Sequence, residues 1–99
     1  MKDLVSIIIP TRNSGELLEN CLKSVRQQTY KNVEVIVVDG KSTDTTLSIA
    51  KQYKCKIFIF APPVKKGIFD ASFKRNYGAK KATGEYVYWL DADMELPKT

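Results

Sequence analysis

The stretch VSIIIPTRN, at residues 5–13, passes from an apolar run directly into a polar loop. The run over residues 4–9 is almost continuous, as in strands that are covered on both faces of a parallel sheet. Pro10 is expected to end it. Residues 5–13 therefore predict a buried parallel strand whose carboxyl end opens into a polar loop.

Further strands are predicted where short apolar runs recur. They are expected over residues 33–38, 56–60 and 85–90. The third strand is closed by prolines at 62 and 63. A helix over residues 68–83, with Gly84 as its C-cap, is expected before the last strand.

Two more helices are predicted between the earlier strands, where apolar residues recur at helical spacing. Ser14 is the expected N-cap of a first helix of about 13 residues. Ser42 or Thr43 is expected to cap a second, with Asp44 in its first turn, where a negative charge suits the helix dipole.

Strands that alternate with helices indicate βαβ units and a parallel sheet. We therefore predict a single α/β domain over residues 1–99. It should be a three-layer αβα sandwich around a mostly parallel sheet of about four strands in the order 3-2-1-4, a Rossmann-like half-fold.

Ligands of such sheets bind outside the carboxyl ends of the strands. The segments that follow the predicted strands are residues 10–13, 39–42, 61–63 and 91–93. All but 61–63 are rich in polar or charged side chains. They should line one rim of the sheet, where we expect the binding site.

Composition favours an ordinary globular domain with anionic partners. The formal charge is +5, from 16 Lys and Arg against 11 Asp and Glu. That balance suits nucleotides, nucleic acid or a membrane surface, or is simply a solvated basic surface. Aromatic residues alternate with expected core positions and follow no basic stripe, which disfavours nucleic acid.

Other residue types narrow the chemistry and the location. The chain has no histidine, which excludes histidine-based catalysis, and its two cysteines, Cys21 and Cys55, are expected to be buried thiols. No apolar run approaches the roughly 20 residues of a membrane span. With no cleavage site of a signal peptide in the sequence, we expect a cytoplasmic location, which includes the cytoplasmic face of a membrane.

Asp91-Ala92-Asp93 is the sharpest local signal for chemistry. Two carboxylates separated by one small residue at a strand end can bind Mg²⁺ or Mn²⁺ together with the oxygens of a diphosphate. The alternative is a pair of turn-forming or helix-capping aspartates.

Asp39 and Arg75 are further candidates for binding. The Asp39 carboxylate can accept a hydrogen bond from a base or ribose, or it is a turn residue beside Gly40. The Arg75 guanidinium suits a phosphate, or it lies on a solvated helix face. No dinucleotide-binding glycine motif, P-loop or serine nucleophile elbow is present.

Several motifs, in this order, resemble the inverting family 2 glycosyltransferases. They are VSIIIPTRN at 5–13, CLKSV at 21–25 with QTY at 28–30, EVIVVD at 34–39 with STDTT at 42–46, RNYG at 75–78, ATGEY at 82–86 and LDAD at 90–93. The resemblance covers essentially the whole chain and implies the nucleotide-sugar-binding half of a GT-A fold.

By this resemblance, the donor is a UDP- or GDP-sugar and the cofactor is Mg²⁺ or Mn²⁺. Pro10, Thr11 and Asn13 would shape the base and ribose pocket, and Asp39 would contact the base. The remaining site residues would lie nearer the diphosphate and sugar: Arg75 near the diphosphate or base, Asp91 at the ribose or sugar, and Asp93, with Asp91, at the metal.

The sequence departs from the family pattern in two places. The family often has a second acid directly after the position of Asp39, where this chain has Gly40-Lys41, which affects the choice of base. Family members also extend well beyond the metal motif, and the later part supplies the acceptor pocket and the general base. We therefore expect no catalytic base in this chain, donor binding without efficient transfer, and self-association through the exposed strand at 85–90.

Two alternatives remain open at this stage. One is a non-catalytic module that binds a nucleotide or docks a partner. The other is a nucleotidyltransferase, although the loop after the first strand has only one glycine, Gly15.

Overall fold

The computed structural model describes residues 3–60 and 70–97. Within these residues, parallel strands form a single sheet in the order β3-β2-β1-β4. The strands are β1 (Val5–Thr11), β2 (Val33–Asp39), β3 (Lys56–Ile59) and β4 (Tyr86–Trp89). The predicted strand order is confirmed.

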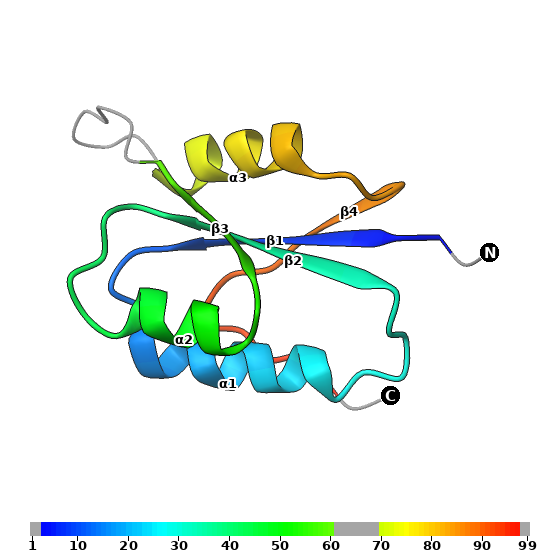
Figure 1. Cartoon of the computed structure of the whole chain (residues 1–99), viewed down its shortest axis with the longest axis horizontal. Helices are drawn as coiled ribbons and strands as arrows, with labels where there is room; N and C mark the ends of the chain where they lie inside the picture. Colours follow the sequence, from blue (N-terminus) through cyan, green and yellow to red (C-terminus); the bar gives the residue numbers. More distant parts are fainter. Residues whose placement is uncertain (1–2, 61–69, 98–99) are drawn as a thin grey trace.

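Helices cover both faces of the sheet, which gives the predicted three layers (Figure 1). Helices α1 (Gly15–Arg26) and α2 (Thr46–Gln52) lie together on one face, and α3 (Asp70–Lys81) lies on the other. None of the helices in the described part of the chain is long and apolar enough to cross a membrane. Residues 61–63, expected to follow the third strand, and the predicted helical residues 68–69 lie outside the described residues.

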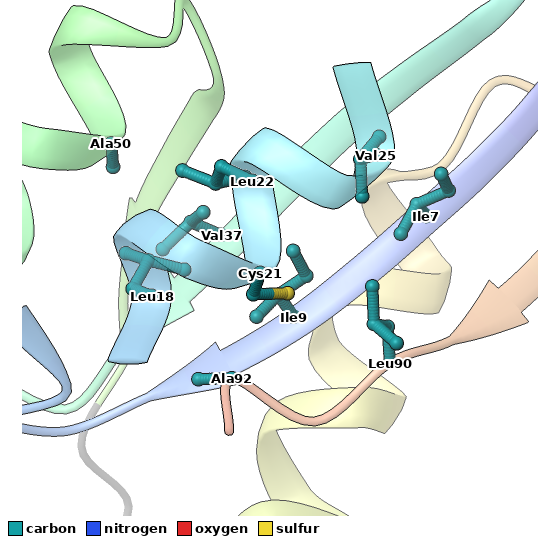
Figure 2. Packing of buried hydrophobic residues seen from close by; sticks show 10 residues of the cluster. All are labelled: Ile7, Ile9, Leu18, Cys21, Leu22, Val25, Val37, Ala50, Leu90 and Ala92. Atoms are coloured by element: carbon teal, nitrogen blue, oxygen red, sulfur yellow. The ribbon is translucent and has the colours of Figure 1, made fainter. Parts of the chain in front are cut away.

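Strand β1 contributes to the core on both faces, as its apolar run predicts. Ile7 and Ile9 pack with Leu18 and Leu22 of α1 (Figure 2). Ile8 packs with Ile36 and Val38 on the face covered by α3. Alternate side chains of a strand point to opposite faces, so a strand between two helical layers must be apolar throughout.

The prediction that Pro10 ends β1 is wrong, because the strand continues to Thr11. The backbone N–H and carbonyl groups of every second residue in a strand point to the same neighbouring strand. The Ile8 carbonyl accepts a hydrogen bond from Leu90 N, on the β4 side. The Pro10 nitrogen, which carries no hydrogen, faces that same side, beyond the last residue of β4. The proline therefore removes no hydrogen bond of the β1–β2 ladder.

The predicted cap of α2 is wrong as well. The N-cap is Thr45, and neither Ser42 nor Thr43 starts the helix. Ser42 N donates to the carboxylate of Asp39 (2.7 Å), and Thr43 N donates to the Asn13 side chain (2.8 Å). These contacts hold both residues in the loop that precedes the helix.

Asp44 lies before α2 and not in its first turn. Its carboxylate accepts hydrogen bonds from Thr46 N (3.0 Å) and Gly15 N (3.2 Å), at the starts of two helices. The hydrogen bonds from Thr46 lower the pKa of Asp44. Ser14 is the N-cap of α1, as predicted, but its side chain makes no capping hydrogen bond.

Gly84 is not a helix cap, because α3 ends at Lys81. A Cβ at position 84 would lie 2.7 Å from Leu4 O and 2.9 Å from Ser6 N. Gly84 N also donates to Ser6 Oγ (2.8 Å). Glycine is required here by the close approach of the chain to β1.

The cysteines differ in burial. Cys21 is fully buried, as predicted, whereas Cys55 is only partly buried. Burial raises the pKa of the Cys21 thiol to about 12 and that of Cys55 to about 11. Both thiols are therefore neutral at pH 7.

Glu34 of β2 joins neighbouring segments at the amino end of the sheet. Its carboxylate accepts hydrogen bonds from Lys56 Nζ (2.6 Å) and Thr83 N (2.7 Å), and also from the Ser6 hydroxyl. Desolvation opposes ionisation, but the hydrogen bonds from Lys56, Ser6 and Thr83 prevail and lower the pKa of Glu34 from 4.5 to about 2.

Replacing Glu34 with glutamine is expected to lower the free energy of unfolding at pH 7 by about 2 kcal/mol, typical of hydrogen bonds to a charged group. A depressed pKa contributes stability that is present above pH 4.5 and is lost as the pH falls towards 2. Urea unfolding at pH 7 and pH 3 should show a smaller pH effect in Glu34→Gln than in the wild type. Exposed Glu85 provides the control variant, Glu85→Gln, and equal pH effects in all three proteins would contradict the prediction.

Candidate functional site

A cleft of about 450 Å³ opens at the carboxyl ends of β1 and β4. Polar and charged residues make up most of its lining, as predicted for this rim of the sheet. The structure brings together here Pro10, Thr11, Arg12, Asn13, Ser14, Leu17, Lys74, Asp91, Ala92 and Asp93. The predicted site residues Asp39 and Arg75 are not in the cleft wall, although each contacts a residue that is.

Asp39 lies beneath the cleft and is fully buried. Its carboxylate accepts hydrogen bonds from Thr11 Oγ1 (2.6 Å), Ser42 N (2.7 Å) and Ser42 Oγ (2.5 Å). Both carboxylate oxygens are therefore occupied within the protein. In this conformation, Asp39 holds the loops after β1 and β2 together, and its predicted contact with a base stays a prediction.

Asn13 fixes the same two loops from the other side. Its backbone has a positive φ of 48°, a region that asparagine tolerates better than most residues. Asn13 N donates to Ser42 Oγ (2.7 Å), and Asn13 Oδ1 accepts from Thr43 N (2.8 Å). The loop that borders the cleft is therefore held in place by hydrogen bonds between residues far apart in the sequence.

Arg75 of α3 reaches the site through Asp91. The two side chains form an ion pair and are 34% and 47% exposed, so each remains partly accessible. Arg75 Nε is buried and has no hydrogen-bond partner among the described residues. The guanidinium thus places positive charge beside the first carboxylate of the Asp91-Ala92-Asp93 motif.

Buried and accessible residues alternate along this motif, so both of its carboxylates stay accessible. Leu90 and Ala92 are buried in the core with Cys21 (Figure 2). Asp91 is partly exposed and Asp93 is exposed. The Asp91 carbonyl accepts from Met94 N (3.0 Å), which turns the chain after the strand.

The carboxylates at the cleft provide some, but not all, of the ligands that a hard divalent cation needs. Carboxylate oxygens are the ligands that Mg²⁺ and Mn²⁺ prefer. The part of the chain that the structure describes contains no group of three or more His, Cys, Asp or Glu side chains that could hold a metal ion. Asp91 and Asp93 therefore fit a site that is completed by the oxygens of a bound ligand.

Lys74 is a cleft residue that the sequence analysis missed. It is 2% exposed, and its Nζ donates to the Thr11 carbonyl (3.0 Å). In the sequence it is one of many lysines on helices. The signal that could have identified it is its position directly before Arg75, the helical cation that the sequence did single out.

The fold defines an α/β domain with a cleft at the carboxyl ends of its parallel strands, which is the candidate ligand site. Residues 6–99 match the profile described as Glycosyl transferase family 2, and the chain belongs to this family.

Relatives by sequence are glycosyltransferases of greater length. The poly(ribitol-phosphate) beta-N-acetylglucosaminyltransferase TarP of Staphylococcus aureus (strain N315) is 41% identical over 93 residues, covering 90% of this chain and 28% of TarP. The uncharacterized glycosyltransferase YibD of Escherichia coli (strain K12) is 36% identical over 95 residues, covering 96% of this chain and 27% of YibD. The chain thus spans little more than a quarter of the length of these relatives.

Solved structures agree with the fold. S. aureus TarS superposes with a TM-score of 0.82 at 34% identity, covering 99% of this chain and 18% of TarS. The mannosyltransferase PcManGT of Pyrobaculum calidifontis, solved with GDP-Man and Mn²⁺, gives 0.77 at 30% identity, covering 98% of this chain and 29% of PcManGT. TarS residues 1–349 have also been solved with UDP-GlcNAc, with a TM-score of 0.73 at 34% identity, covering 94% of this chain and 27% of that one.

Proposed function

We propose that this chain binds the donor of an inverting glycosyl transfer, a UDP- or GDP-sugar. The observation that carries the proposal is a single cleft lined by the loop after β1 and by both carboxylates of the Asp91-Ala92-Asp93 motif. Relatives of the same fold solved with UDP-GlcNAc and with GDP-Man and Mn²⁺ support it. A cytoplasmic location is also proposed, on the sequence alone.

Each segment that lines the cleft has a distinct role in this proposal. Pro10, Thr11 and Asn13 shape the pocket for base and ribose, and Asp39 supports it through Thr11. Asp91, from the segment after β4, approaches the ribose or sugar in this proposal. Arg75 pairs with Asp91, so its charge also faces the region assigned to the diphosphate.

Asp93, together with Asp91, is proposed to hold Mg²⁺ or Mn²⁺. A divalent cation bound there would neutralise negative charge on the departing diphosphate. The residues themselves orient the nucleotide, and the two protein carboxylates leave coordination positions for phosphate oxygens. Metal and nucleotide should therefore bind jointly.

The Asp93→Ala variant tests this joint binding. In the wild type, Mn²⁺ is expected to strengthen UDP or GDP binding, and in Asp93→Ala this enhancement should be absent because one of the two protein carboxylates is gone. Calorimetric titration with and without Mn²⁺ measures the effect, and Glu95→Ala removes a nearby exposed acid outside the cleft as the control. Amide chemical shifts should map the nucleotide to residues 10–13 and 91–93.

Two results would reject the proposal. One is nucleotide-induced shifts confined to the amino-end rim of the sheet. The other is strong Mn²⁺ binding in the absence of nucleotide that Asp93→Ala leaves unchanged.

The exposed edge of the sheet supports a second proposal. We propose that a second copy of the chain docks at β4. All four residues of β4 are exposed, including Tyr86 (58%), Tyr88 (47%) and Trp89 (46%). Strand β4 pairs with β1 on one side, and among the described residues no strand pairs with it on its outer side. An exposed apolar edge strand is a template for pairing.

The chain is therefore expected to self-associate as its concentration rises, and Tyr88→Lys should shift it towards the monomer because charge on an edge strand opposes pairing. Sedimentation equilibrium over a range of concentrations measures the association. Ile59→Lys on β3, which replaces a 49%-exposed residue at the opposite edge, is the matched control. A wild-type chain that stays monomeric throughout would contradict the proposal.

A further inference from the structure

A second cavity, of about 560 Å³, lies where β2 and β3 begin, at the rim of the sheet opposite the cleft. Its volume is within the range of small-molecule sites in proteins. Four cationic side chains line it, Arg26, Lys31, Lys54 and Lys56, together with a single carboxylate, Glu34. The rest of its lining is valine and tyrosine. The cavity therefore combines positive charge with an apolar and aromatic wall.

Glu34 compensates little of this positive charge. Its carboxylate pairs with Lys56 Nζ at 2.6 Å and also accepts a hydrogen bond from Thr83 N at 2.7 Å. Among residues 3–60 and 70–97, no carboxylate pairs with Arg26, Lys31 or Lys54. Like charges around one cavity repel one another, and an anion inside it would relieve that repulsion.

Two of these cations are held in place by contacts that leave their charge available. The Arg26 guanidinium lies 4.5 Å from the centre of the Tyr53 ring, and the ring face orients it without neutralising it. Lys31 Nζ donates to the Arg26 carbonyl at 2.6 Å, and an ammonium can donate up to three hydrogen bonds. Both side chains therefore keep donors for a ligand.

The backbone of Lys54, directly after the C-cap of α2, is left-handed, with a φ of 58°. This conformation is common after a helix, but glycine is the usual residue because a side chain there is strained. Lys54 lines the cavity in spite of this strain. Strain at a residue that lines a cavity favours a functional role for its side chain.

We propose that this cavity binds a soluble phosphate monoester that carries an aromatic or other apolar group. The guanidinium of Arg26 provides a planar fork of donors for the phosphate, and the ammonium groups of Lys31 and Lys54 add charge-assisted hydrogen bonds. The tyrosines and valines of the wall contact the apolar group. The site is separate from the cleft and does not depend on the proposed function.

Phenyl phosphate is the probe, with phenol and inorganic phosphate for comparison. Amide chemical shifts should map phenyl phosphate to residues 25–35 and 53–56, and added salt should weaken its binding because exposed charges are screened. Inorganic phosphate should bind more weakly because it leaves the apolar wall uncovered, and phenol should cause no shifts. Shifts confined to residues 10–13 and 91–93, or no shifts at all, would overturn the inference.

Two variants separate binding from folding. Arg26→Gln and Lys54→Gly should each weaken phenyl phosphate binding about fivefold, the upper range for an ion pair at an exposed site. Lys23→Gln, an exposed cation on α1 outside the cavity, should leave it unchanged. Because glycine relieves the left-handed backbone, the thermal unfolding midpoint of Lys54→Gly should not fall below that of the wild type. Equal affinity in the wild type, Lys54→Gly and Arg26→Gln would contradict the inference.

Vesicles of phosphatidylcholine, with and without phosphatidic acid, distinguish a soluble ligand from a membrane surface. Phosphatidic acid presents the same phosphate monoester on a lipid. Cosedimentation with these vesicles in the absence of phenyl phosphate binding would overturn the inference in favour of a membrane surface. The proposed donor site is tested separately, since nucleotide binding is mapped at residues 10–13 and 91–93.

Discussion

Gly78→Leu is expected to destabilise the chain by about 3 kcal/mol, the upper range for overpacking a core. Gly78 lies where α3 crosses the sheet, and a Cβ there would be 2.5 Å from Ile8 Cγ2 and 3.1 Å from Val38 Cγ2. Both neighbours are fully buried, so neither can move into solvent. A leucine must therefore lift α3 away from β1 and β2.

Helix propensity alone would make Gly78→Leu stabilising, so the expected loss of stability comes from overpacking. Leucine is a better helix former than glycine by somewhat less than 1 kcal/mol. Leucine and lysine have similar helix propensities, so the exposed-site control Lys80→Leu should be nearly neutral. Chemical denaturation of both variants measures the difference. A Gly78→Leu chain as stable as the wild type would mean that α3 does not pack on the sheet as the structure has it.

The strand order and the three layers could be predicted because they depend on a local property, the length and continuity of apolar runs. Residues 4–9 are apolar on both alternating faces, and this is the pattern of a central strand between two helical layers. The carboxyl-end rule then located the rim from topology alone. For this reason Pro10, Thr11, Asn13, Asp91 and Asp93 could be assigned to one site before any coordinates.

The errors arise where a residue's role is decided by a distant partner. Ser42 has the composition of a helix cap, but the carboxylate of Asp39 holds it in a loop. Gly84 has the position of a helix terminus, but contact with Leu4 and Ser6 explains it. Such choices between equivalent hydrogen-bonding options are settled by tertiary structure.

Lys74 was missed for the same physical reason. A lysine on a helix is solvated by default, and only the crossing of α3 over the ends of β1 and β2 brings its ammonium to Thr11 and Gly40. The converse holds for Asp39, whose predicted contact with the base competes with hydrogen bonds from Thr11 and Ser42.

The chain by itself is expected to bind donor and to transfer sugar negligibly. Inverting transfer requires a base that removes the proton of the acceptor hydroxyl as it attacks the anomeric carbon. The acids that line the described cleft are Asp91 and Asp93, and both are assigned to the donor and its metal. Glu95 is exposed and lies close in sequence to Asp93, and Asp39 is buried and hydrogen-bonded on both oxygens.

General-base assistance contributes about 10²–10⁴-fold to rate, and loss of acceptor positioning removes still more. Transfer of radiolabelled sugar from UDP- and GDP-sugars to lipid, saccharide and protein acceptors should therefore fall at least about 10²–10⁴-fold below that of a full-length family member. Nucleotide titration of the same sample is the control that shows a folded site. Efficient turnover by residues 1–99 alone would contradict the prediction, and Asp39→Asn and Glu95→Gln would then show which of these carboxylates acts as the base.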